Sequence, residues 1–150
     1  MSGAPSSVVS FAGLILDLPG DWYDMTNVGA SGPPTLAMAD GVGALQFSVD
    51  RYTDGKLPNA TPTDIEHMFY AFCERHRLSI DPTAWTSDTT FGTGGSSAGA
   101  VRLIGVWYVS DGLNFAFATY TSERPDDEAA QREVRQAELI AKSIRFPGTP

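Results

Sequence analysis

The sequence predicts an α+β fold in which two amphipathic helices pack against an antiparallel sheet of about six strands. Two Asp-Gly pairs, Asp40-Gly41 and Asp111-Gly112, each join two apolar stretches in the manner of β-hairpins. Two other stretches repeat apolar residues every three or four positions, as amphipathic helices do. Hairpins join antiparallel neighbours, and a helix must bury its apolar face. These observations together therefore favour a sheet packed with helices.

The N-terminal part supplies the first strands. Within residues 11–18, leucine stands at every second position from Leu14 to Leu18 before Pro19-Gly20 ends the strand. Residues 36–39 predict a short strand. Residues 45–50 alternate apolar with polar side chains, which predicts a strand with one buried face and one face in water. Composition predicts two loops, at 29–34 and 53–60.

Two helices follow from capping signals and periodicity. Thr61 can cap a helix, Pro62 suits the first helical position, and the apolar repeat ends near Arg77. The acidic run 126–128 opens the second helix and complements its dipole, and the apolar stripe continues to Ile144.

The C-terminal half is predicted to contain three further strands, at 85–91, 101–109 and 113–121. The glycine- and serine-rich segment 92–99 between the first two is predicted to be a flexible loop. Trp107 is expected in the core. Phe115 and Phe117 are expected on the same face as Trp107.

Length and composition fit one domain spanning 1–150, which is long enough to fold without a disulfide or metal. The single cysteine, Cys73, excludes an intramolecular disulfide. The N-terminus lacks the basic head of a signal peptide, and no run approaches the ~20 apolar residues of a membrane span, so we expect a cytoplasmic protein. The formal charge of −8 argues against nucleic-acid and membrane partners and favours a basic protein partner.

The candidate chemistry-bearing residues form no complete set, so we expect no catalytic centre, metal or cofactor. Residues 95–99 match G-x-S-x-G, but both histidines precede them and a strand follows where a nucleophile elbow needs a helix. His67 and His76 are nine residues apart, on opposite sides of the predicted helix. Cys73 and His76 form a C-x-x-H pair, which supplies two of the four ligands of a structural zinc site.

Aromatic residues near strand ends are the remaining candidates for contacts with a partner. Tryptophan and tyrosine are enriched at interfaces as well as in cores. We therefore predict Trp22, Tyr23, Asp24 and Trp85 as partner-binding residues. Packing in the core is the alternative for the three aromatic residues.

The order of motifs resembles the PsbP-like fold. A first strand ends in residues 18–22 (LPGDW), a hairpin contains residues 107–112 (WYVSDG), and a last helix closes with residues 140–146 (IAKSIRF). Photosystem extrinsic proteins, a small Ran-binding import factor and bacterial cytoplasmic chaperones of type VI secretion effectors share this fold. The resemblance implies an α/β/α sandwich that acts by binding proteins and has no catalytic centre.

The sequence thus predicts a non-enzymatic protein-binding module, such as a bacterial immunity protein or an effector-associated chaperone that acts by surface complementarity. Its partner would be a protein, for example a basic toxin or a secreted effector. One alternative is a small-molecule carrier or unrecognised enzyme with a pocket between sheet and helix. Another is a structural or assembly subunit. The sequence leaves the oligomeric state open.

Overall fold

The computed structural model describes residues 6–26, 33–50 and 60–147, without the side chain of residue 50. The loops predicted at 29–34 and 53–60 therefore fall outside the described residues, apart from positions 33, 34 and 60.

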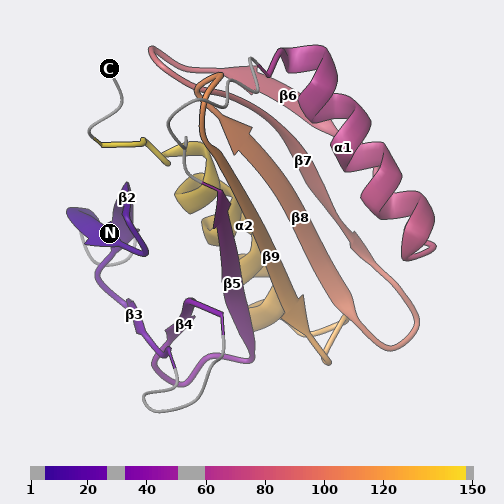
Figure 1. Cartoon of the computed structure of the whole chain (residues 1–150). Helices are drawn as coiled ribbons and strands as arrows, with labels where there is room; N and C mark the ends of the chain where they lie inside the picture. Colours follow the sequence, from indigo (N-terminus) through magenta and orange to yellow (C-terminus); the bar gives the residue numbers. More distant parts are fainter. Residues whose placement is uncertain (1–5, 27–32, 51–59, 148–150) are drawn as a thin grey trace.

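Seven strands form one antiparallel sheet in the order β3-β4-β5-β9-β8-β7-β6 (Figure 1). Their bounds are Trp22–Asp24 (β3), Thr35–Met38 (β4), Gly43–Asp50 (β5), Thr83–Thr86 (β6), Phe91–Ala98 (β7), Leu103–Ser110 (β8) and Phe115–Ser122 (β9). Both Asp-Gly pairs lie between antiparallel neighbours, because β4 pairs with β5 and β8 pairs with β9. The predicted antiparallel α+β class is confirmed.

A separate two-stranded ribbon, β1 (Ser6–Phe11) and β2 (Leu14–Pro19), replaces the single strand predicted at 11–18. Its turn consists of Ala12 and Gly13, whose φ angles of 55° and 81° are both left-handed, as a two-residue hairpin turn requires. Because alanine gives no signal for this backbone conformation, the hairpin was missed. The ribbon is fastened to the C-terminal segment by paired backbone hydrogen bonds of 2.9 and 2.8 Å between Ile15 and Arg145.

Both predicted helices are present, on opposite sides of the sheet (Figure 1). Helix α1 (Pro62–Arg75) begins with a capping box in which the Asp64 N–H donates to Thr61 Oγ1 at 3.2 Å and the Thr61 N–H donates to Asp64 Oδ2 at 3.0 Å. Helix α2 (Glu128–Lys142) is capped by Asp127. Helix α1 packs on β7 and β8, whereas α2 packs across β8, β9, β5 and the ribbon.

The larger core lies between the sheet and α2. It contains Trp107 as predicted, together with Leu45, Phe47 and Tyr120 from neighbouring strands and Ile140 from the helix. Successive side chains of a strand point to opposite faces, so Val106 and Tyr108 face α1, where they join a smaller core with Phe69 and Cys73.

The strand register corrects the placement of Phe117. This residue pairs directly with Tyr108, so its ring lies on the α1 face and not with Trp107. Phe115 pairs with Ser110 and lies on the same face as Phe117.

The predicted glycine-serine loop is instead part of strand β7, which contains eight residues and pairs with both β6 and β8. The glycines leave space for indole rings on the α2 face. A Cβ atom on Gly94 would contact the Trp107 ring and the Val106 carbonyl oxygen, and one on Gly92 would contact the Trp85 ring. Composition alone predicts a loop here, because this close packing involves residues that are distant in sequence.

A buried carboxylate joins α2 to the sheet. The Tyr120 hydroxyl donates to Glu133 Oε1 at 2.8 Å, and the Val42 N–H donates to Glu133 Oε2 at 2.9 Å. Glu133 is 3% exposed and Tyr120 is fully buried. Burial, followed by the hydrogen bond to Glu133, raises the pKa of Tyr120 well above its ordinary value.

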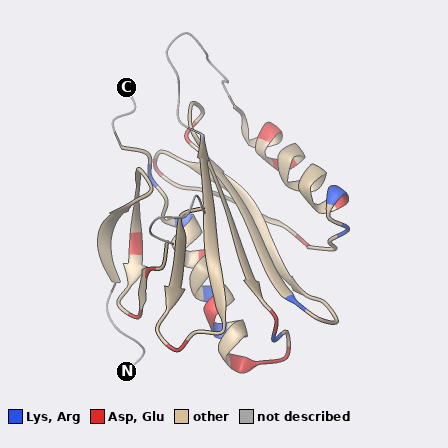
Figure 2. Cartoon of the chain, turned by 60° about the horizontal axis from the view of Figure 1, so that its bottom comes forward, with Lys and Arg blue, Asp and Glu red and all other residues tan. Residues whose placement is uncertain are grey.

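Charged residues lie mainly on turns and on the helices, the ribbon strands carry only Asp17, and the large strands carry almost none (Figure 2). Among the residues that the structure describes, neither helix is long and apolar enough to cross a membrane.

Candidate functional site

One side of the sheet is only partly covered. Helix α1 packs mainly on β7 and β8, and the same face of β9, β5 and β4 has no helix over it in the described part of the chain (Figure 1). Six residues form this region, which we call the open surface: Thr35, Ala44, Gln46, Ser48, Thr119 and Thr121. The pairs Thr35–Gln46, Gln46–Thr119 and Ala44–Thr121 place them side by side on three strands.

The open surface carries hydroxyl, amide and methyl groups and no charge. Gln46 and Ser48 are exposed, and the threonines are half-buried. The alternation at 45–50 had predicted that one face of this strand would lie in water, and this prediction is confirmed. A face of this kind offers hydrogen-bond donors and acceptors to a partner without the cost of desolvating an ion.

Four rings form an aromatic border where the open surface meets α1. Phe72 lies 4.9 Å from Phe117 and 4.2 Å from His76, and Phe117 lies 4.5 Å from Tyr108 (centroid distances). Three of these rings are partly exposed and His76 is exposed. Burial raises the pKa of Tyr108, an effect that the charge of Arg75 partly opposes, so its hydroxyl is neutral at physiological pH.

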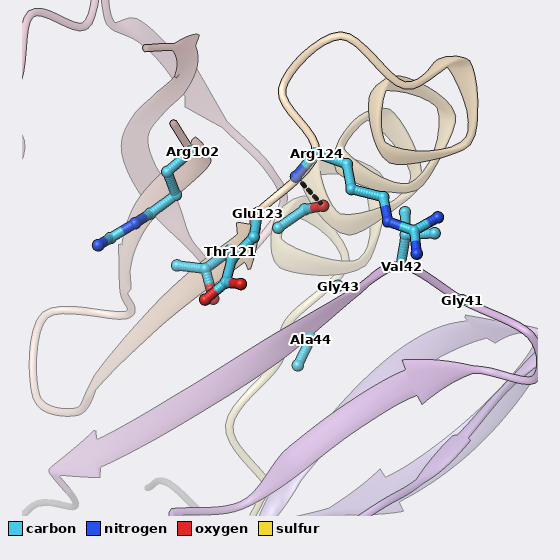
Figure 3. A pocket seen from close by; sticks show the side chains of 9 residues that line it. Gly41, Val42, Gly43, Ala44, Arg102, Thr121, Glu123 and Arg124 are labelled. Carbon is cyan, nitrogen blue, oxygen red and sulfur yellow. Dashed lines mark hydrogen bonds between the residues drawn. The ribbon is translucent and has the colours of Figure 1, made fainter. Parts of the chain in front are cut away.

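A cavity of about 540 Å³ lies at one end of the open surface. Figure 3 shows its lining, which comes from the β4–β5 turn, the start of β8 and the end of β9. Glu123 and Thr121 lie close together there, and the Arg124 N–H donates to Ser122 Oγ at 3.2 Å. The Arg102 side chain extends away from Glu123 in this view. The cavity thus continues the open surface with polar groups.

The four residues predicted to bind a partner are not brought together. Trp22 lies in β3 and Trp85 in β6, which are the two edge strands of the seven-stranded sheet. Trp22 is 3% exposed, and its indole N–H donates to the Gln136 side chain of α2 at 2.7 Å. In this structure Trp22 therefore packs in the core, the alternative to partner binding given for it above, and its hydrogen bond joins edge strand β3 to α2.

Trp85 is half-buried on the α2 side of the sheet, where Lys142 Nζ lies 5.6 Å from its ring centroid. The tyrosine and the aspartate of the predicted set remain accessible. Tyr23 is 44% exposed, on the same side of the sheet as the open surface. Asp24 is exposed and accepts a hydrogen bond from the Thr26 N–H at 2.8 Å, and hydrogen bonds from Thr26 lower its pKa. The role of these residues in binding stays a prediction.

Ser97, His76 and Cys73 are the residues that the sequence offered for catalysis or metal binding. Ser97 and His76 line one cavity of about 500 Å³, but no aspartate or glutamate lines it with them. Cys73 is buried, which raises the pKa of its thiol. Within residues 6–26, 33–50 and 60–147, no three His, Cys, Asp or Glu side chains gather in a way that could hold a metal ion.

Sequence reasoning missed the aromatic border. Its members come from α1 and its C-cap, β8 and β9, and only the placement of the helix across two strands joins them. The placement of Phe117 on the α1 face could have been found from the hairpin, because the strand pairing fixes which residues share a face.

The chain is similar in structure to proteins whose structures have been solved. The solution structure of cyanobacterial PsbP (CyanoP) from Synechocystis sp. PCC 6803 superposes with a TM-score of 0.58 at 13% identity, covering 97% of this chain and 95% of that one. A crystal structure from Bacteroides thetaiotaomicron VPI-5482 gives a TM-score of 0.53 at 12% identity, covering 97% of this chain and 49% of that one. No protein-family model and no curated protein sequence matches the chain.

The chain therefore has a PsbP-like fold, as the order of sequence motifs predicted. At this level of identity the similarity concerns the fold, and function must be argued from the site.

Proposed function

We propose that the protein is a non-catalytic protein-binding module whose partner docks on the open surface. The observation that supports this proposal is the open surface, whose six residues are uncharged and lie under no helix among the described residues, with an aromatic border along α1. Aromatic residues are enriched where proteins bind one another, and polar side chains on a sheet face supply directional hydrogen bonds.

Within this class we propose an immunity protein or an effector-associated chaperone as the specific role. The net charge of −8 would speed association with a basic partner, and the charged residues lie mainly on turns and helices around large strands that carry almost none (Figure 2). Association should then slow as the salt concentration rises, whereas dissociation should change little.

A pair of matched substitutions tests the proposal. Gln46→Arg places a long cation in the middle of the open surface, and Gln131→Arg makes the same chemical change on the exposed side of α2. Affinity-tagged protein is used to capture partners from the native host, and the captured proteins are identified by mass spectrometry. We expect Gln46→Arg to lose the specific partner and Gln131→Arg to retain it, with both variants unfolding at the wild-type temperature.

Two outcomes would contradict the proposal. One is the capture of no specific partner by the wild-type chain at low salt. The other is a partner that Gln46→Arg and Gln131→Arg retain equally, since the binding surface would then lie elsewhere.

A further inference from the structure

A second cavity, of about 500 Å³, lies between the C-terminal end of α1 and the β7–β8 hairpin. We call it the hairpin groove. Its lining includes Arg77 and Arg102 but no aspartate or glutamate. In a chain whose net charge is −8, this cavity is locally cationic.

The two arginines of the hairpin groove have no partner for their guanidinium groups among the residues that the structure describes. Elsewhere in the described chain, Arg145, Arg124 and Arg132 lie 3.1, 3.7 and 3.9 Å from carboxylate oxygens, whereas Arg75 and Arg135, which do not line the hairpin groove, form no ion pair with a described residue. Arg77 and Arg102 are both exposed. Two unpaired guanidinium groups beside one cavity are suited to binding carboxylates.

The groove also offers apolar and hydroxyl groups. Ile104 and Leu78 are half-buried, and Val101 at the hairpin tip is 73% exposed. Ser79 and Ser97 add hydroxyl groups to the same lining. This mixture of groups fits a bound peptide that alternates acidic with apolar side chains better than it fits a free inorganic anion.

The hairpin groove is continuous with the open surface. Ser97 pairs with Ile104, Ile104 pairs with Thr121, and Thr121 pairs with Ala44, so one row of side chains crosses four strands on one face. Arg102 lines both the hairpin groove and the cavity at the other end of this row (Figure 3). A segment bound in the groove could therefore extend onto the open surface.

We propose that the hairpin groove binds an acidic, partly apolar peptide segment of the protein partner, with carboxylates on Arg77 and Arg102. This inference rests on the proposed function and adds one feature to its partner, which is basic as a whole and carries one short acidic segment. A nucleic acid or an anionic membrane would be repelled by the net negative charge, whereas a short acidic segment meets mainly the local cations.

The test uses the full chain and a fluorescein-labelled peptide of alternating glutamate and leucine, with a glutamine-leucine peptide as the neutral comparison. Fluorescence anisotropy measures Kd for the wild type and for Arg102→Gln and Arg77→Asn. Asparagine is chosen at position 77 because φ is 57° there, and asparagine tolerates the left-handed region. Arg132→Gln, on α2, is the control with the same loss of charge.

We expect the acidic peptide to bind, and the groove variants each to raise Kd by about fivefold, a typical upper effect for an exposed ion pair. The control should leave Kd unchanged, and the neutral peptide should bind more weakly than the acidic one. In NMR spectra, peptide should shift the amide signals of Ser97 and Ile104 at concentrations where inorganic phosphate does not.

The inference is overturned if the peptide does not bind, if Arg132→Gln weakens binding as much as the groove variants do, or if phosphate alone gives the same shifts. If it fails while Gln46→Arg still abolishes partner capture, the proposed function stands and only the groove assignment falls. If Gln46→Arg has no effect, the proposed function fails whatever the peptide does.

Discussion

Removing the Tyr120 hydroxyl should destabilise the protein through the buried carboxylate of Glu133. Glu133 Oε1 accepts from this hydroxyl at 2.8 Å, and its other oxygen accepts from the Val42 N–H at 2.9 Å. Tyr120→Phe deletes one oxygen atom, leaves the ring in place and removes one of these two donors. A hydrogen bond to a charged group contributes about 1.5–3 kcal/mol, so we expect the free energy of unfolding to fall by about 2 kcal/mol.

Urea unfolding followed by far-UV circular dichroism at neutral pH measures this change, and the m-value should stay constant. Tyr70→Phe is the matched control, because the Tyr70 side chain on α1 is 50% exposed and its loss should change the free energy by less than about 0.5 kcal/mol. A double-mutant cycle of Tyr120→Phe with Glu133→Gln should show a coupling energy of about 1 kcal/mol or more. The reasoning is refuted if Tyr120→Phe and Tyr70→Phe have equal effects.

Three further predictions concern the core. Gly94→Ala should lower the free energy of unfolding by about 1–3 kcal/mol, because the new Cβ atom meets the Trp107 ring and a backbone oxygen. Gly99→Ala is the control in the same urea experiment. Its Cβ atom would lie 3.4 Å from the nearest neighbour, so the free energy of unfolding should change little. Because the pKa of Tyr120 is raised in the folded protein, its hydroxyl loses its proton at a lower pH in the unfolded chain than in the folded one. The stability that the neutral hydroxyl contributes is therefore complete below about pH 10 and is lost as the pH rises further. In a pH titration followed by phenolate absorbance, one tyrosine should therefore ionise at a higher pH than an ordinary tyrosine, and Tyr120→Phe should remove this step. If the step is unchanged by that substitution, it does not belong to Tyr120. The buried Cys73 thiol, with its raised pKa, should react with an aromatic disulfide reagent many times more slowly in the native protein than in urea, and equal rates would show that it is accessible.

The elements with local signals were predictable from the sequence. The cap at Thr61 and the proline at position 62 placed the start of α1, and the alternation at 45–50 indicated which side of β5 meets water. The ribbon turn at Ala12 was not predictable, because alanine rarely adopts a left-handed conformation. Strand β7 was missed because its glycines pack against Trp85 and Trp107, which its own sequence does not encode.

The candidate site was less predictable than the fold. The alternation of polar residues on β5 predicted one of the three strands that carry the open surface. The extent of that surface depends on how far α1 reaches across the sheet, which is a matter of tertiary packing. Arg77 and Arg102 are brought to one groove only by the placement of the helix end beside a hairpin. Trp22 and Trp85, two of the predicted partner-binding residues, lie on opposite edge strands of the sheet, and Trp22 is buried. Their role in binding stays a prediction.

The fit between the indole of Trp85 and Gly92 has a consequence for how this chain can diverge. Because the ring occupies the space that a side chain at position 92 would need, position 92 cannot gain a side chain unless the residue at position 85 becomes smaller. Related sequences should therefore exchange the two as a pair: a bulkier residue at 92 should accompany a smaller one at 85. An alignment that shows these columns varying independently would mean that β6 can shift its distance from the rest of the sheet.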